Sequence, residues 1–114
     1  MCRAIWALAI GPDEAACGRI RRAAGADVQV IAMATTLTRA RELIGESELD
    51  VAVVDATTPD AYGIVTNLRR QHPKVAIVWI GDEPPEIAHA SLPHDEADGD
   101  HVPGAITRAL IARR

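Results

Sequence analysis

Residues 51–70 read VAVVDATTPDAYGIVTNLRR and decide the fold of this chain of 114 residues. The β-branched run Val51–Val54 is typical of a strand buried on both faces, and it ends at the carboxylate of Asp55. Pro59 shapes the turn that follows, and Gly63 lies early in a helix whose apolar residues recur at helical spacing. Ligands collect at the carboxyl ends of strands in open α/β sheets, so Asp55 is the first candidate functional residue.

Strands and helices alternate on both sides of this stretch. Strands are predicted over residues 4–10, 28–34, 51–54 and 75–80, and helices over residues 13–24, 37–44 and 60–71. Asp13 and Thr36 are the expected N-caps of the first two helices, and Gly25 and Gly45 their expected stops. The alternation predicts a doubly wound parallel sheet with helices on both faces.

The carboxyl third allows two registers, because Pro84 and Pro85 cannot both lie inside a helix. In the favoured register residues 89–92 are the fifth strand, the helix before it shrinks to about one turn, and an acidic loop leads to a last helix. That helix carries an apolar stripe and takes Asp100 as its N-cap. In the other register residues 85–92 form a helix and residues 100–102 the fifth strand.

Composition excludes several functions. A chain of this length suits one α/β domain, and 48% hydrophobic residues suit a packed core. The net charge of −4, scattered basic residues and three aromatic residues give no footprint for nucleic acid. No apolar run is long enough to span a membrane. Two cysteines without metal-site spacing indicate a reducing, cytoplasmic setting.

Residues 51–70 resemble the phospho-acceptor region of response-regulator receiver domains of the chemotaxis-regulator type. In that family an aspartate, a proline and a glycine occur at the offsets of Asp55, Pro59 and Gly63. The resemblance implies a flavodoxin-like, five-stranded parallel sheet of order 2-1-3-4-5. It also implies that residues 1–114 form a single receiver-like domain, here with helix four shortened or absent.

The same resemblance implies four functional positions, of which this chain keeps one. Asp55 stands at the phospho-acceptor position, but Ile10–Pro12 replace the acidic pair that holds Mg²⁺ in the family. Gly81 stands where the family has a switch hydroxyl. The lysine position is His94 in the favoured register and Pro103 in the other. Phosphoryl transfer depends on charge neutralisation, so these changes indicate a degenerate receiver, or pseudo-receiver.

Asp13 and Asp82 could restore a metal site beside Asp55. Asp13, after a backbone shift, and Asp55 are the candidate Mg²⁺ ligands, and Asp82 adds an oxygen beyond the switch position. The simpler interpretation makes Asp13 an N-cap and Asp82 a solvated loop acid. Asp55 likewise has a structural alternative, in which it accepts backbone N–H bonds from Thr57 or Thr58. On this interpretation no cofactor is expected.

Three functions follow from these observations. The favoured one is a non-enzymatic signalling domain that acts through protein–protein interaction, without Mg²⁺-dependent phosphorylation. The second is a phosphorylatable single-domain response regulator that accepts a phosphoryl group on Asp55 from a histidine kinase. The third is a flavodoxin-like protein that binds a small ligand. The expected partner is a protein, either a histidine kinase or an output domain, and a homodimer stays open.

Overall fold

The computed structural model describes residues 5–46, 48–97 and 101–113. The elements are β1 (Ile5–Ile10), α1 (Glu14–Ala23), β2 (Val28–Ala34), α2 (Leu37–Glu46), β3 (Val51–Asp55), α3 (Ala61–Gln71), β4 (Ala76–Ile80), β5 (Ala90–Leu92), the 3₁₀ turn η1 (His94–Glu96) and α4 (His101–Ala112). The strands form one sheet of order β2-β1-β3-β4-β5, and every pairing is parallel. The predicted flavodoxin-like sheet is therefore confirmed.

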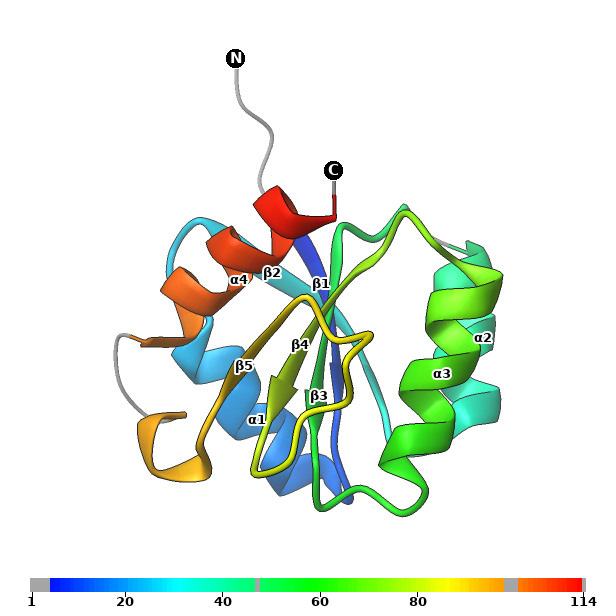
Figure 1. Ribbon diagram of the computed structural model, residues 1–114, viewed down its shortest axis with the longest axis horizontal. Coiled ribbons are helices and arrows are strands. Elements are labelled where there is room, and N and C mark those ends of the chain that lie inside the picture. The colour runs from blue at the N-terminus through cyan, green and yellow to red at the C-terminus, as the bar shows by residue number, and fades with distance from the viewer. Residues whose placement is uncertain (1–4, 47, 98–100, 114) are drawn as a thin grey trace.

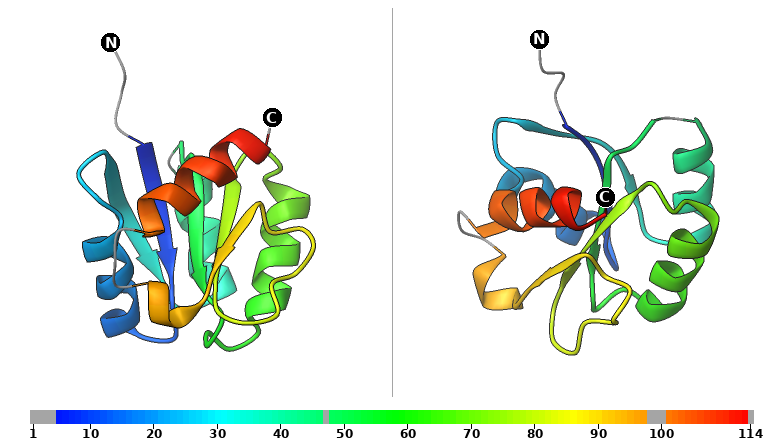
Figure 2. Two further views of the ribbon diagram at one scale, coloured as in Figure 1. Left: turned by 60° about the vertical axis from the view of Figure 1, so that its left-hand side comes forward. Right: turned by 45° about the horizontal axis from the view of Figure 1, so that its top comes forward.

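Helices cover both faces of the sheet, α1 and α4 on one side and α2 and α3 on the other (Figures 1 and 2). Successive side chains of a strand point to opposite faces, so one strand feeds two cores. Val53 packs with Cys17 and Ile106 in the core beneath α1 and α4. Its neighbour Val54 packs with Ile64 in the core beneath α2 and α3. β3 and β4 are buried along their whole length for this reason.

Local signals set most helix ends. The side chain of Asp13 caps α1 by accepting from the Ala16 N–H at 2.8 Å, and Thr36 accepts from the Arg39 N–H at 3.2 Å, as predicted. The predicted stop at Gly45 is wrong, because α2 continues to Glu46. A glycine ends a helix by turning left-handed, and Gly45 is not among the residues with positive φ. Within the described ranges no helix is long and apolar enough to cross a membrane.

The fifth strand follows the favoured register. β5 spans Ala90–Leu92, so the alternative with a helix over residues 85–92 is wrong. Residues 81–89 form an irregular loop without a helix, and Pro84 and Pro85 lie within it. Ile87 and Ala88 of this loop pack against the core beneath α2 and α3. The one-turn helix expected in the favoured register is therefore absent from residues 81–89, and the loop covers the sheet surface in its place. Asp98 and Asp100, parts of the predicted acidic loop and cap, lie outside the described residues.

Candidate functional site

Asp55 is the last residue of β3, at the carboxyl edge of the sheet, and is only 7% exposed. Its Oδ1 accepts two hydrogen bonds from Thr57, from the backbone N–H at 2.9 Å and from the hydroxyl at 2.7 Å. The Thr58 hydroxyl donates to the Asp55 carbonyl oxygen at 2.7 Å. The bond from the Thr57 N–H is the turn-capping interaction that the sequence predicts. Asp55 therefore organises the turn that leads into α3.

His94 reaches Asp55 from a segment 39 residues further along the chain. It is the first residue of η1, two residues after the end of β5, and its Nε2 lies 2.9 Å from Asp55 Oδ1. An ionised carboxylate only accepts hydrogen bonds, so Nε2 carries the proton in this contact. The imidazole side chain is 45% exposed. The contact ties the ends of β3 and β5 together across β4.

The surroundings of Asp55 favour its ionised form. Burial is the largest influence and by itself would raise the pKa of Asp55. Hydrogen bonds from His94 and from Thr57, together with the attraction of His94, outweigh burial and hold the pKa of Asp55 below its ordinary value. The carboxylate is therefore charged at neutral pH, and the groups that stabilise this charge, Thr57 and His94, belong to the domain itself.

Gly81 makes the His94 contact sterically feasible. Its φ of +142° is one that L side chains rarely adopt. A Cβ on Gly81 would lie 2.4 Å from the Ala56 Cβ and 3.0 Å from His94 Cε1. The end of β4 thus leaves room for the imidazole to pass over it toward Asp55. A threonine or serine at this switch position would require both neighbours to move.

Pro59 and Gly63 shape the turn between β3 and α3. Pro59 is exposed in that turn, and the next residue, Asp60, has a left-handed φ of 57°. A Cβ on Gly63 would lie 2.4 Å from a carboxylate oxygen of Asp60. Gly63 therefore makes room for the Asp60 carboxylate at the start of α3. Local packing thus accounts for the glycine at position 63.

Asp13 and Asp82 are the other candidate pocket acids, and the structure gives a capping role to the side chain of Asp13 alone. Both side chains are exposed. The Asp13 carboxylate is the N-cap of α1, and the Asp82 carbonyl oxygen accepts from Trp79 Nε1 at 3.1 Å. Among the described residues, no group of three or more His, Cys, Asp or Glu side chains is placed to hold a metal ion.

A cavity of about 180 Å³ opens beside Asp55. Arg19 of α1 and His94 line it, together with apolar side chains of α1 and β4. Sequence reasoning did not find Arg19, since a single arginine on an amphipathic helix is most often a solvated residue. Only the packing of α1 on the sheet places its guanidinium beside the carboxyl edge. The cavity thus combines one carboxylate with two basic side chains.

The loop after β4 is fastened next to this site. The Tyr62 hydroxyl donates to the carbonyl oxygen of Glu83, and the Tyr62 ring lies 4.9 Å from the ring of Trp79. Trp79 is buried in the core, whereas Tyr62 is 49% exposed. Tyr62 therefore contacts both the core and the loop.

Comparisons with known proteins identify the fold. No family model matches the sequence, and no curated protein matches it. The structure is similar to the signal receiver domain of an HD domain-containing protein from Pseudomonas fluorescens Pf-5. The TM-score is 0.78 at 16% identity, over 97% of this chain and 98% of that one.

Two further solved structures agree. The isolated REC domain of RcsB from Salmonella enterica serovar Typhimurium, in the apo form, gives a TM-score of 0.78 at 14% identity, covering 90% of this chain and 85% of that one. The non-phosphorylated receiver domain of the stress response regulator RcsB from Escherichia coli gives 0.75 at 16%, covering 91% of each chain. This chain therefore has the fold of response-regulator receiver domains.

Proposed function

We propose that residues 1–114 form a single atypical receiver domain, a pseudo-receiver, that signals by binding another protein without Mg²⁺-dependent phosphorylation of Asp55. The observation that carries this proposal is the occupation of Asp55 Oδ1. That oxygen accepts hydrogen bonds from the Thr57 N–H, the Thr57 hydroxyl and His94. A carboxylate oxygen with three donors around it is a poor ligand for a cation.

The other pocket positions support the same proposal. The residues present do not fit a Mg²⁺ site, because Mg²⁺ needs oxygen ligands around it and the Nε2–H of His94 points at the carboxylate instead. The Asp13 carboxylate already accepts the capping hydrogen bond from the Ala16 N–H of α1. Gly81 provides no hydroxyl to follow a phosphoryl group. His94 is part of the domain itself and donates a hydrogen bond to Asp55. This bond holds the pocket in one arrangement.

A non-enzymatic binding role follows from this arrangement. Receiver domains signal by presenting a surface to a partner, and here the partner would be a histidine kinase or an output domain. The surface beside the pocket is formed by the loop of residues 81–89, β5 and η1, which Tyr62 and His94 fasten to the body of the domain. A cytoplasmic location fits such a partner.

The experiment is an amide NMR titration with Mg²⁺ followed by beryllofluoride, a mimic of the phosphoryl group on aspartate. We expect the resonances around Asp55, Gly81 and the turn after β1 to stay in place. A receiver domain with a complete pocket, titrated in parallel, shows that the reagents are active. Shifts concentrated around Asp55 that vanish in Asp55→Asn would overturn the proposal.

One observation favours a second function, phosphorylation of Asp55 as a single-domain response regulator. Within the described part of the chain no hydrogen bond is formed by Asp55 Oδ2, and Arg19 and His94 line the adjoining cavity. Two basic side chains could neutralise a phosphoryl group where Mg²⁺ and lysine do so in the family. Incubation with a small-molecule phosphodonor and intact-mass measurement tests this function. A phosphoryl adduct on the wild type that is absent from Asp55→Asn would establish it.

A further inference from the structure

β2 is an edge strand with little protection against pairing. It borders β1 on one side only, and its seven residues VQVIAMA include no charged residue and no proline. Ile31 is 43% exposed and Met33 is 41% exposed, although both are large apolar residues. Natural edge strands usually carry charges or prolines that prevent pairing with another chain. An uncharged edge of this length can accept a further strand.

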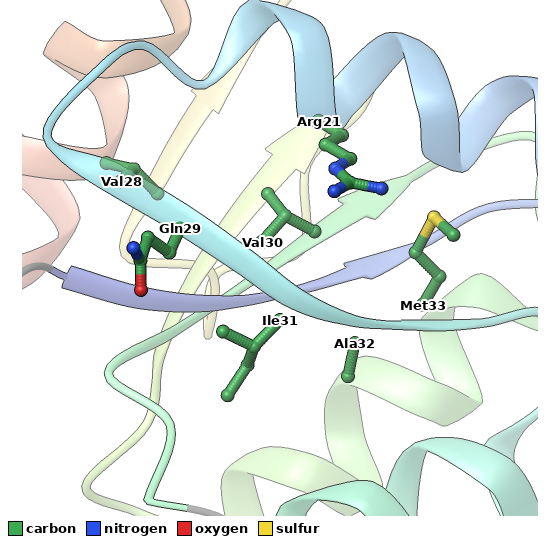
Figure 3. A pocket seen from close by; sticks show the side chains of 7 residues that line it. All are labelled: Arg21, Val28, Gln29, Val30, Ile31, Ala32 and Met33. Atoms are coloured by element: carbon green, nitrogen blue, oxygen red, sulfur yellow. The ribbon is translucent and has the colours of Figure 1, made fainter.

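The side chains along this edge form a shallow groove. The groove has a volume of about 670 Å³ and is lined by Arg21 and residues 28–33. Figure 3 shows Met33 and Arg21 on one side of the strand and Ile31 on the other. Pairing with β1 skips Ile31, so the strand has an irregularity at its centre. Each face of the edge therefore offers one apolar side chain beside the open backbone groups.

α1 flanks this edge with one acid and one base. Glu14 lies in the first turn of α1 and Arg21 in the last turn. They are seven residues apart, which is close to two full turns, so both project from the same side of the helix. Arg21 lines the groove, which places that side next to β2. α1 starts at the carboxyl edge of the sheet, so Glu14 lies toward that edge and Arg21 lies toward the opposite edge.

α2 flanks the opposite face of the edge with the reverse order. Arg39 and Glu46 are also seven residues apart, with the base first. Arg41 of the same helix faces the end of α3, because it lines a hollow with Gln71. Arg39 and Glu46 are exposed on α2, and α2 packs against β2. An acid at a helix C-terminus opposes the helix dipole, so the stability of α2 does not account for this order.

We propose that β2 is a docking surface for a second copy of this chain, paired antiparallel about a twofold axis. Such an axis places α1 of one copy beside α1 of the second copy, and α2 beside α2. Each helix then runs antiparallel to its counterpart. Glu14 then faces Arg21 of the second copy, and Arg39 faces Glu46 of the second copy. A parallel arrangement would turn one copy over and set α1 beside α2 of the second copy, so that Glu14 would meet Arg39 and Arg21 would meet Glu46. The charge swap described below separates the two arrangements. Twofold pairing thus matches both charge pairs at once.

The pairing does not depend on the function proposed for Asp55, which lies at a different part of the sheet.

Arg39 also forms an ion pair with Glu42 at 3.1 Å, but both side chains are more than half exposed. Such an exposed pair contributes little, so it leaves the guanidinium free to face a second copy.

Sedimentation velocity of the full chain, from low micromolar to millimolar concentration, tests the surface. We expect a dimer that Ile31→Lys abolishes. The matched control is Ile111→Lys on α4, where the side chain is 60% exposed but belongs to another face. A wild-type chain that stays monomeric at millimolar concentration overturns the proposal. So does a dimer that Ile111→Lys removes and Ile31→Lys spares.

A charge swap tests the twofold geometry. Arg39→Glu alone sets acids against acids, and Glu46→Arg alone sets bases against bases, so each variant is expected to lose most of the dimer. Mixed in equal amounts, the two variants regain opposite charges at both contacts, and a heterodimer of at least wild-type affinity is expected. Failure of the mixture to associate would overturn the antiparallel arrangement.

Discussion

At the residue scale, a single carboxylate oxygen concentrates the chemistry of this molecule. Asp55 Oδ1 is bonded by Thr57, two residues away, and by His94, whose position in space depends on β5. A buried charge costs free energy unless hydrogen bonds compensate it, and here they do so without an external ion. Asp55 thus joins the end of β3 to the turn that follows β5.

Replacing His94 by alanine should raise the pKa of Asp55. Burial would remain while the strongest of the opposing hydrogen bonds would be lost. We also expect a loss of about 1 kcal/mol in the free energy of unfolding, modest because the imidazole is nearly half exposed. Carbon-detected NMR titration of the carboxyl group measures the first effect. Asp95→Asn, an exposed neighbour, is the control and should leave the titration unchanged.

Gly81→Ala should destabilise the domain by about 2 kcal/mol or more, because of its φ and the close contact with Ala56. Gly45→Ala is the matched control. It lies in α2 with nothing within 4 Å of its added Cβ, so it should stabilise by about 0.5–1 kcal/mol. Urea denaturation measures both changes. A harmless Gly81→Ala would contradict the role of Gly81 in admitting the imidazole.

At the element scale, the segment between β4 and β5 replaces a helix by a loop held at several points. Tyr62 fastens its start, Ile87 and Ala88 pack on the core, and His89 fastens its end. The His89 N–H donates to the Ile77 carbonyl oxygen at 2.9 Å, and the Ile77 N–H donates to His89 Nδ1 at the same distance. His89 therefore begins the pairing that β5 continues.

His89 should make stability depend on pH. Burial, and then the charges of Arg69 and Arg113, hold the pKa of His89 below its ordinary value in the folded chain. The unfolded chain, with an imidazole pKa of about 6.5, therefore binds protons first as the pH falls. The stability that neutral His89 contributes is complete above about pH 6.5 and is lost as the pH falls toward the folded-state pKa of His89.

Urea denaturation across this range, with His89→Gln beside the wild type, measures the effect. The wild type should lose stability below about pH 6.5, and His89→Gln should show a smaller slope. His101→Gln removes an exposed histidine and should keep the wild-type slope. Equal slopes for all three proteins would refute the assignment to His89.

At the scale of the whole molecule, the last helix links the two ends of the sheet. α4 covers the sheet face above β4 and β5 (Figure 2). Arg113 follows the end of α4, at the edge of the sheet opposite Asp55. The Arg113 guanidinium donates to the carbonyl oxygens of Asp50 at 2.8 Å and Lys74 at 2.9 Å. These carbonyl groups precede β3 and β4, so one side chain joins three segments.

Arg113→Ala should lower the free energy of unfolding by about 1–2 kcal/mol, because two hydrogen bonds from a charged donor are lost. Arg108→Ala, at an exposed position on α4, is the control and should change stability by less than about 0.5 kcal/mol. Thermal and urea unfolding give the comparison. A similar loss in both variants would indicate an effect of charge rather than of the two bonds.

Local sequence determined much of this protein. β-branched runs predicted the strands, apolar periodicity predicted the helices, and Asp13 was recognised as a cap because such signals act over a few residues. The two prolines disfavoured a long helix before β5, and the favoured register of β5 was confirmed. The boundary at Gly45 was wrong, because nothing in the sequence says which sign its φ takes.

Tertiary structure alone decided how the site is assembled. The sequence gives no distance between Asp55 and His94, which meet only because parallel strands bring their carboxyl ends to one edge. Arg19 joins them because α1 packs across that same edge. The exposed edge of β2 likewise depends on strand order. Neighbouring residues determine short-range backbone preferences, whereas contacts between distant side chains depend on how the whole sheet packs.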